Sequence, residues 1–428
     1  MKSLFFLLVF SINSGLWISA QQTMKSSSTR KEYFPLPDSV GGWRTLTDNK
    51  KIKQVTGMDK AKLDQAFDFV RSTTNNGGLL VVRHGWLVYE KYFGMGQREA
   101  TPNLASCGKA FTSISVGILM SERPDLFPDG LDQKVYITTL MPPEAFPLPD
   151  PRMADIKLGQ LLTHTAGIRG NNPVYINGKT STIDPVGPDG WFGGVDDYTL
   201  GINDGKMGSV PFTTKTLWCE PGGGFSYASA SVHNASIMLR HVTGMELQDY
   251  IKTHIAKSLG WGLWGYGYKN AALVTHTLGN GGIALRSTDM LRFCYMLLHE
   301  GRWGQQQIIP KEYIQKATKI SPYNPHYPSY SLQFKVNSDG NIPDLPRDSY
   351  SWGGSGGYCF YVVPSLDLIV WKLAGRDEQY SPANTGLPEP PKLSEVIKPI
   401  NDGQKHDFHV DNTKMIMMVI SSIVDEKK

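Results

Sequence analysis

The sequence predicts an α+β fold, and two observations support that prediction. Strand-like runs occur in two separate parts of the chain, at residues 79–89 and again from about 280 to 374, whereas residues 140–280 combine loops with helical patterns. Strands and helices that are segregated along a chain are typical of α+β proteins. With 428 residues and a hydrophobic content of 40%, the chain can also bury a large core.

The first 20 residues predict a secretory signal peptide. Lys2 is followed by an apolar stretch, residues 3–17, and the small residue Ala20 directly precedes a polar segment. This order of charge, apolar core and small residue is typical of exported proteins. A membrane anchor is the alternative, but polar residues interrupt the stretch and make it a poor membrane span. We therefore expect a secreted or periplasmic protein, cleaved after Ala20.

Three elements are expected after this peptide. Residues 21–40 are polar and contain prolines, which predicts an extended arm. Residues 58–70 carry apolar side chains at helical spacing, with Asp59 placed as the N-cap of an amphipathic helix. Residues 79–82 and 87–89 flank a short turn and predict a β-hairpin.

The carboxy-terminal part predicts a second hairpin and a closing helix. Residues 358–363 and 368–371 are rich in β-branched and aromatic side chains, and a turn at Pro364 separates them. Residues 415–420 are apolar but too few to cross a bilayer. They are better interpreted as the buried face of a terminal helix, so no transmembrane segment is expected in the mature chain.

The segment Ser106-Cys107-Gly108-Lys109 indicates nucleophilic catalysis. Ser106 and Lys109 are one helical turn apart, so their side chains leave the same face of a helix. A serine hydroxyl becomes a strong nucleophile only when a neighbouring base takes its proton, and a lysine at this spacing can do so. The helix N-terminus adds positive potential where an oxyanion would form. The alternative is an ordinary surface pair, because the spacing alone is common.

Two later segments favour the catalytic interpretation. A loop rich in proline and glycine, residues 220–224, precedes Tyr227 and a helical pattern. A tyrosine displayed at such a junction can act as a general base in a cleft. The segment Trp352-Gly353-Gly354-Ser355 then leads into the strand at 358, and glycines at a strand often mark the close approach of backbone and ligand.

Together these segments resemble the signature of the class C β-lactamase family, which includes penicillin-binding peptidases and family VIII carboxylesterases. That signature is Ser-x-x-Lys, then Tyr-x-Asn or a variant, then Lys, His or Trp followed by x-Gly. Residues 161–168, 281–290 and 301–310 are similar to further segments of the family, in the same order. The resemblance covers residues 55–375, and its Trp-Gly-Gly segment is similar to that of some family VIII esterases.

The resemblance implies a β-lactamase/transpeptidase-like form of the α+β fold. An antiparallel sheet would be flanked by the terminal helices, and a mostly helical subdomain would be inserted into it. Residues 41–428 would form a single catalytic domain, with an α/β part at about 41–140 and 280–428 and a helical part at about 141–279. The site would lie in the groove between the two parts, a common position for ligand sites.

The resemblance also implies a role for each motif residue. Ser106 would be the acylated nucleophile, and Lys109 and Tyr227 would pass its proton to the leaving group. The backbone N–H groups of Ser106 and Ser355 would form the oxyanion hole. Residues expected to contact the substrate are Trp352, Gly353, Gly354, Ser229 and Tyr175. No cofactor is expected, and no His/Cys spacing predicts a metal site.

Two departures from the family pattern bear on the substrate. Ser229 stands where the family has the asparagine of Tyr-x-Asn, and Trp352 stands where many members have a lysine. An anionic substrate would lose a charge-assisted contact at Trp352, whereas an indole offers an apolar wall. We therefore expect a neutral ester or amide substrate, with carboxylesterase as first choice. The alternatives are an amidase, D-amino-acid peptidase or β-lactamase on the same site, an acyltransferase, or a catalytically silent binding protein.

A competing motif has Ser355 at its centre. Residues 353–357 match Gly-x-Ser-x-Gly, the nucleophile elbow of α/β-hydrolases. The acid and base would be Asp367 or Asp377 with His406 or His409. That elbow has to lie between a strand and a helix, whereas the residues after Ser355 predict a hairpin, so the context contradicts the motif.

Charge and cysteine content limit the remaining possibilities. The net charge of +4 is spread along the chain and lacks the concentrated basic patch expected for nucleic-acid binding. An exported chain can form disulfides, and four cysteines allow three pairings that sequence does not distinguish. Free buried thiols are equally compatible with the sequence. The cysteines are Cys107, Cys219, Cys294 and Cys359. The oligomeric state is not predicted.

Overall fold

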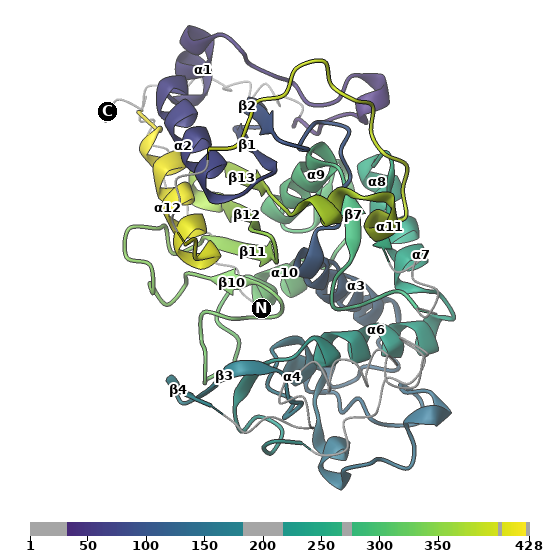
Figure 1. The fold of residues 1–428 in the computed structure, drawn as a ribbon. Coiled ribbons are helices and arrows are strands. Elements are labelled where there is room, and N and C mark those ends of the chain that lie inside the picture. Colours follow the sequence, from purple (N-terminus) through teal and green to yellow (C-terminus); the bar gives the residue numbers. More distant parts are fainter. Residues whose placement is uncertain (1–31, 183–216, 268–275, 401–404, 425–428) are drawn as a thin grey trace, which may run out of the picture. The chain divides into compact units, whose positions relative to one another are not determined.

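A six-stranded antiparallel sheet lies at the centre of residues 34–428 (Figure 1). The structure is a computed structural model that describes residues 32–182, 217–267, 276–400 and 405–424. In spatial order the strands are β10 (Lys335–Val336), β11 (Tyr350–Gly354), β12 (Tyr358–Val363), β13 (Leu368–Leu373), β1 (Gly77–Arg83) and β2 (Trp86–Phe93). Because β1 pairs with β13, the hairpin near the amino end completes a sheet whose other strands come from beyond residue 334.

Both hairpins of the sequence analysis are confirmed. β1 and β2 are joined through His84 and Gly85, whose φ angles of 52° and 70° are those of a two-residue hairpin turn. β12 and β13 are joined through a short 3₁₀ turn at Pro364–Leu366 and Asp367. The antiparallel sheet, together with the helices that pack on it, confirms the α+β prediction.

Two helices cover one face of the sheet. α2 (Lys60–Thr73) and α12 (Phe408–Ser421) lie side by side on this face (Figure 1), and α1 (Asn49–Thr56) precedes them in the chain. Asp59 caps α2 by accepting a hydrogen bond from the Ala61 N–H. Apolar residues of both helices join one core with strand residues, among them Leu63, Phe67, Val81, Val370, Met415 and Val419. The amphipathic helix and the terminal helix are thus both confirmed.

The other face of the sheet packs on α9 (Ser287–Leu298), and α3 (Gly108–Glu122) packs on α9 in turn. Trp371 donates its indole N–H to Ser287 Oγ at 3.0 Å. Phe293 of α9 stacks on Phe111 of α3 with ring centres 4.0 Å apart. Nearly all of α3 is buried, including its polar residues Lys109, Thr112, Ser113 and Ser115.

The helical part of the chain packs on the far side of α3. Its longest helix, α6 (Ser229–Thr243), contacts α3 and α4 (Leu158–Leu162). A small sheet of order β4 (Lys179–Ser181), β3 (Asn171–Ile176) and β5 (Phe225–Tyr227) lies beside them. The remaining elements are α7 (Leu247–Ile251), α8 (Lys257–Leu259), β6 (Trp264–Tyr266), β7 (Ile283–Leu285), β8 (Arg302–Trp303), β9 (Gln306–Gln307), α10 (Lys311–Ala317) and α11 (Pro382–Thr385).

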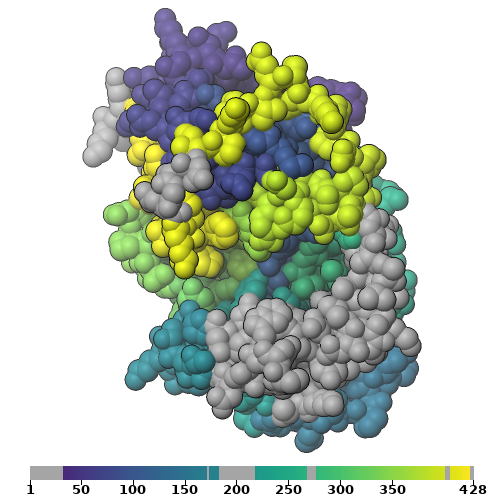
Figure 2. All heavy atoms as spheres, viewed as in Figure 1, coloured from purple at the N-terminus to yellow at the C-terminus, as the bar shows by residue number. Residues whose placement is uncertain are grey.

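The segment after α11 returns across the surface to α2 and β2 (Figure 2, yellow-green). Its backbone is anchored where the Gly94 N–H donates to the Ile397 carbonyl and the Ile400 N–H donates to the Arg71 carbonyl. The expected signal peptide lies outside the described residues, as does most of the expected arm at 21–40. No helix in the described ranges is long and apolar enough to cross a membrane.

Candidate active site

Ser106 lies in a 3₁₀ turn, Ala105–Cys107, that continues into α3. Ala105 has φ 48°, a left-handed conformation that costs energy for a residue with a side chain. The Asn103 side chain stabilises this conformation, because its Oδ1 accepts the Ala105 N–H at 2.9 Å. The Leu104 N–H donates to the Ile283 carbonyl at 2.8 Å. Ala105 directly precedes Ser106. Because its backbone is held in this conformation, it fixes the direction in which the Ser106 side chain leaves the backbone.

Lys109 is 1% exposed and points back to this serine. Its ammonium donates to Ser106 Oγ at 3.1 Å, to the Asn280 carbonyl at 2.6 Å and to Ser229 Oγ at 3.3 Å. No ion pair among the described residues includes Lys109. The amine is thus surrounded by neutral oxygens, and a proton can pass between it and the serine hydroxyl.

Two glycines allow the Asn280 carbonyl to reach Lys109. A Cβ atom added to Gly108 would lie 2.8 Å from the Cα of Gly281, closer than real contacts allow. Gly281 also has φ 155°, within the range that side chains rarely adopt. The Thr112 hydroxyl donates to the neighbouring Gly279 carbonyl at 2.6 Å. The segment at 279–282 is therefore held against the first turn of α3.

Tyr227 reaches the same place from the small sheet. It ends β5, two residues before Ser229 opens α6. The Lys109 ammonium lies 4.9 Å from the centre of the Tyr227 ring, and the ring is half-buried. The structure thus brings Ser106 and Lys109 of one segment together with Tyr227 and Ser229 of another; their catalytic roles stay predictions.

His164 supports the Tyr227 segment as a neutral side chain. The Ala228 N–H donates to its Nδ1 at 3.2 Å, and its Nε2 lies 2.9 Å from the Tyr330 hydroxyl and 3.2 Å from the Gln333 amide nitrogen. Burial, helped by the nearby positive charge of Lys109, lowers the pKa of His164 to about 3. The imidazole therefore stays uncharged at neutral pH and holds the backbone between Tyr227 and Ser229.

The third motif lies on β11, where Gly354 allows its backbone to approach the nucleophile turn. A Cβ atom on Gly354 would lie 2.3 Å from the Leu104 carbonyl oxygen. The Trp352 indole N–H donates to the Ser106 carbonyl at 2.6 Å. Ser355 follows in the exposed turn between β11 and β12. The motif thus contacts the turn that carries Ser106 through its backbone and through Trp352.

The position of Trp352 differs from the expected apolar wall. The side chain is 4% exposed and packs edge-on against Tyr330, with ring centres 5.0 Å apart. Its indole therefore holds the Ser106 peptide in place and offers little surface to a ligand. Sequence reasoning missed this role because no local pattern shows where an indole N–H points.

Tyr175, another expected substrate contact, lies on β3 among aromatic side chains. It stacks on Tyr327 with ring centres 4.6 Å apart and meets Phe225 edge-on at 5.7 Å. Phe225 in turn contacts His164. Tyr175 thus packs within an aromatic cluster, and its expected contact with the substrate stays a prediction.

A cation that the sequence analysis did not single out lies beside the β11–β12 turn. The Arg376 guanidinium is 3.5 Å from Ser355 Oγ. It is exposed and forms an ion pair with Glu378. An exposed, paired charge is strongly screened, so Arg376 is a weak substitute for the lysine that Trp352 replaces.

The structure rules out the elbow centred on Ser355. That serine lies in a turn between two strands, whereas the elbow requires a strand and a helix. Asp367 pairs with His84 at 3.0 Å, and His406 pairs with Asp411 at 3.1 Å. The proposed acids and bases are therefore engaged elsewhere.

All four cysteines are free thiols, so none of the three disulfide pairings is present. Cys107, Cys294 and Cys359 are buried. Burial raises the pKa of the Cys107 thiol well above its ordinary value. A protonated thiol is a poor nucleophile, so Ser106 is the better candidate nucleophile of this segment. The described residues hold no cluster of three His, Cys, Asp or Glu side chains placed for a metal ion.

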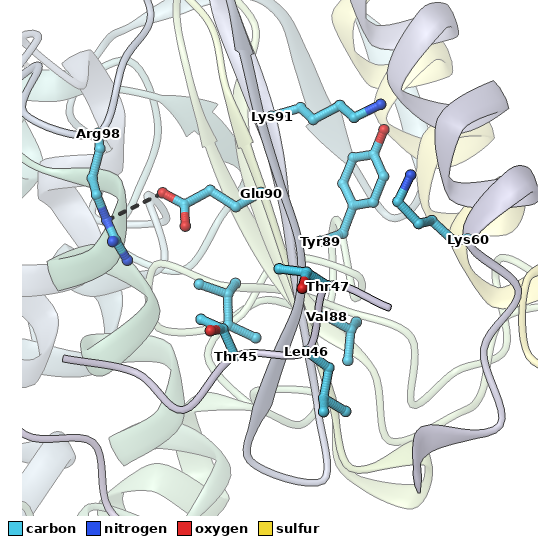
Figure 3. Close-up of a pocket in the computed structure, with 10 residues that line it drawn as sticks. Thr45, Leu46, Thr47, Lys60, Val88, Tyr89, Glu90, Lys91 and Arg98 are labelled. Carbon is cyan, nitrogen blue, oxygen red and sulfur yellow. Dashed lines mark ion pairs between the residues drawn. The ribbon is translucent and has the colours of Figure 1, made fainter. Parts of the chain in front are cut away.

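A hollow of about 300 Å³ lies on β2, away from these residues (Figure 3). Tyr89, Glu90, Lys91 and Arg98 are among the residues that line it, and Glu90 pairs with Arg98 at 3.3 Å. β2 is the outer strand at the opposite edge of the sheet from β10. The hollow shares no residue with the Ser106 cluster, and the chemistry of that cluster makes it the better candidate site.

The comparisons with known proteins bear on the family and the fold. A family model described as beta-lactamase matches residues 70–386. Penicillin-binding protein 4* of Bacillus subtilis strain 168 is 22% identical over 360 residues, which make up 72% of this chain and 70% of that protein.

Two solved structures show a similar fold. EstCE1, described as a hydrolase with promiscuous acyltransferase activity, has a TM-score of 0.56 at 17% identity, covering 85% of this chain and 97% of that one. A D-stereospecific amidohydrolase from a Streptomyces species has a TM-score of 0.51 at 17% identity, covering 76% and 98%. At these identities the likeness shows the fold alone.

Proposed function

Because the chain belongs to the β-lactamase family of serine hydrolases, we propose that it cleaves a carboxylic ester through an acyl-enzyme formed on Ser106. The observation that carries the proposal is the buried Lys109 side chain, whose Nζ lies 3.1 Å from the Ser106 hydroxyl and is surrounded by neutral oxygens. A serine with such a partner is equipped for nucleophilic attack. The fold is β-lactamase/transpeptidase-like, as the family match implies.

Acylation begins with attack of Ser106 Oγ on the substrate carbonyl carbon. Lys109, in its neutral form, takes the hydroxyl proton, which Lys109 and Tyr227 then deliver to the oxygen of the leaving alcohol. The negative charge on the former carbonyl oxygen is stabilised by the N–H groups of Ser106 and Ser355. Collapse of this intermediate breaks the ester bond and leaves the acyl group on Ser106.

Deacylation reverses the proton path with water as the nucleophile. The same pair takes a proton from water, hydroxide oxygen adds to the acyl carbon, and the proton returns to Ser106 Oγ as the bond to the acyl group breaks. A carboxylic acid leaves, and the serine is restored. Trp352 and the strained Ala105 keep the Ser106 peptide fixed through both steps, so little reorganisation is needed.

A neutral ester is favoured over an anionic β-lactam or peptide. The third motif presents Trp352 where a lysine would bind a carboxylate, and the Arg376 charge beside Ser355 is exposed and already paired with Glu378. An amide remains the alternative, as one fold neighbour is described as an amidohydrolase. Acyl transfer to an added alcohol is a second candidate, because EstCE1 is described as having that activity.

Export is part of the proposal. It rests on the pattern of residues 1–20, which predicts a signal peptide cleaved after Ala20. Amino-terminal sequencing of protein recovered outside the cytoplasm should begin at Gln21. A protein that is retained inside the cell with Met1 intact would contradict export without affecting the proposed chemistry.

The proposed activity is tested by hydrolysis of p-nitrophenyl butyrate, compared with that of a chromogenic cephalosporin. We expect the ester to be the better substrate, and Ser106→Ala to lower its turnover by about 10⁴-fold or more. Ser113→Ala is the matched control, because this serine lies on the same helix and bonds to the Leu332 carbonyl. An active Ser106→Ala variant, or preference for the cephalosporin, would overturn the proposal.

A further inference from the structure

Gln379 joins two segments that the proposed mechanism uses. It lies in a 3₁₀ turn, Asp377–Tyr380, shortly after β13, and is 7% exposed. Its side-chain amide nitrogen donates to the Asn103 carbonyl at 3.1 Å and to the Ser355 carbonyl at 3.1 Å. A glutamine amide carries two N–H groups, so one side chain can serve both carbonyls at once.

The rest of the Gln379 residue is held equally firmly. Its backbone carbonyl accepts the Asn103 N–H at 2.8 Å, and its side-chain oxygen accepts the Arg376 N–H at 3.0 Å. The side chain therefore has a hydrogen bond at each end of its amide. Such a buried group, hydrogen-bonded at both ends, has little freedom to move. It therefore holds the backbone segments to which it bonds in fixed positions.

The first of the two segments leads directly to the nucleophile. The Asn103 backbone bonds twice to Gln379, and the Asn103 side chain holds the N–H of Ala105, the strained residue before Ser106. A chain of hydrogen bonds thus runs from Gln379 through Asn103 to Ala105, and it helps to position the Ser106 N–H, the first expected oxyanion donor.

The second segment is the turn that carries the other donor. The Gly357 N–H bonds to the Gly354 carbonyl at 3.1 Å, which closes a four-residue turn with Ser355 inside it. Gly356 has φ 100°, as the third position of a type II turn requires. A Cβ atom on Gly356 would lie 2.4 Å from the Gln379 side-chain oxygen, so Gln379 packs directly against the turn.

We propose that Gln379 is a positioning residue that sets the separation of the two oxyanion-binding N–H groups, those of Ser106 and Ser355. The inference rests on the proposed function, in which these groups stabilise the negative charge. Oxyanion donors act only when they are held at the place where charge develops. A single amide that bridges both donor segments fixes that geometry before substrate arrives.

The test uses two variants of the full chain and one matched control. Gln379→Met keeps the length and removes both donors, whereas Gln379→Glu keeps an acceptor for the Arg376 N–H and turns the donor into a second acceptor. The control is Asn337→Leu. Asn337 is also buried and bridges carbonyls, those of Ile342 and Leu345 at 3.0 and 2.7 Å, but it lies before β11, at the end of that strand away from Ser355.

Three quantities are measured for each variant. They are the acylation rate from the p-nitrophenol burst, the KM for p-nitrophenyl butyrate, and the inhibition constant of phenylboronic acid. A boronic acid adds to the serine and places an oxygen in the oxyanion hole. Its affinity therefore measures how well the two N–H groups are placed to bind that oxygen. Thermal unfolding of each variant gives the accompanying change in stability.

We expect Gln379→Met to lower the acylation rate about tenfold, less than the 10²–10³-fold loss of removing an oxyanion donor outright. The boronate inhibition constant should rise by a similar factor, while KM stays within about twofold. Asn337→Leu should lose stability and leave the burst rate and the boronate affinity unchanged. Equal rates for wild type and Gln379→Met, or the same pattern in the control, would overturn the inference.

Gln379→Glu decides the question if the methionine variant does not fold. At neutral pH its carboxylate faces two carbonyls, so acylation should be slow. Protonation restores one donor, so the deficit relative to wild type should shrink as the pH falls; a deficit that is constant with pH would overturn the inference. A wild-type protein with neither burst nor boronate inhibition would instead disprove the proposed function, and this inference with it.

Discussion

Two buried lysines lie in different regions of this molecule and have different surroundings. Lys109, at the start of α3, is 1% exposed and donates to Ser106 Oγ, Ser229 Oγ and the Asn280 carbonyl. Lys372, on β13, is wholly buried under α12 and donates to Asn412 Oδ1 at 3.0 Å. Burial is therefore common to both, and of the two only Lys109 has a serine hydroxyl at hydrogen-bond distance.

The comparison teaches that desolvation alone does not make a catalytic lysine. Burial lowers the pKa of Lys372 to about 8, a value often associated with active-site lysines. Yet it donates to an amide oxygen, and the charged or ionisable groups that act on it are Asp411 and the Cys359 thiol, whose pKa burial raises to about 12. Catalytic use requires a reacting partner at hydrogen-bond distance, and Lys109 has one.

The largest expected effect comes from replacing each lysine by methionine. Lys109→Met should lower kcat/KM for p-nitrophenyl butyrate by about 10³-fold or more, because the serine loses its proton acceptor. Lys372→Met should change it by less than about twofold, since that side chain lies under α12. Steady-state kinetics of both variants make the comparison. Similar losses of kcat/KM in the two variants would show that Lys109 contributes no more to catalysis than Lys372 does.

The second prediction concerns the pH dependence of stability through Lys372. Its folded-state pKa of about 8 lies below the ordinary 10.5. Between these values the unfolded chain binds a proton that the folded chain has released, so the free energy of unfolding rises with pH, by up to about 3 kcal/mol. Urea denaturation of wild type and Lys372→Met at pH 7.5 and pH 10 measures this.

The stability advantage of Lys372→Met over wild type should therefore shrink by about 2 kcal/mol as the pH rises from 7.5 to 10. Below pH 8 both states of the wild type hold the proton, so the difference should no longer change. An advantage that is the same at both pH values would mean that Lys372 is not desolvated as the structure shows.

A smaller effect is expected from Trp352→Phe, which removes the indole N–H and keeps an aromatic ring. The Ser106 carbonyl then loses its donor, and we expect kcat to fall about tenfold through a less well-held nucleophile. Trp371→Phe is the matched control, because its indole bonds to Ser287 on α9. Equal kcat losses in the two variants would indicate a general packing effect rather than positioning of Ser106.

The sequence predicted those features that have a local signature. The two hairpins follow from β-branched and aromatic runs around short turns, and the Ser106–Lys109 contact follows from a spacing of one helical turn. The convergence of Tyr227 on that pair followed from the family resemblance, not from any local pattern. The α+β fold class was predictable because strand-like runs and helical patterns occupy separate parts of the chain.

The sequence did not predict contacts that depend on tertiary packing alone. The Trp352 indole bonds to a carbonyl 246 residues away, and the Gln379 amide bonds to one 276 residues away. Neither contact leaves a periodic pattern, because a single side chain reaches a backbone atom of a distant segment. The sequence therefore predicted that the Trp352 indole forms an apolar wall for the substrate, whereas in the structure the indole is buried and hydrogen-bonded to the Ser106 carbonyl.

The most direct test of the central claim is the mass of the protein during turnover. Wild type is mixed with p-nitrophenyl butyrate, quenched with acid within the first turnovers, digested and analysed by mass spectrometry, with Ser106→Ala treated identically. The account predicts one butyryl group on the peptide that contains Ser106, and none on that peptide in the variant. A butyryl group on a peptide that contains Ser355 or another residue, or its persistence in Ser106→Ala, would contradict the account.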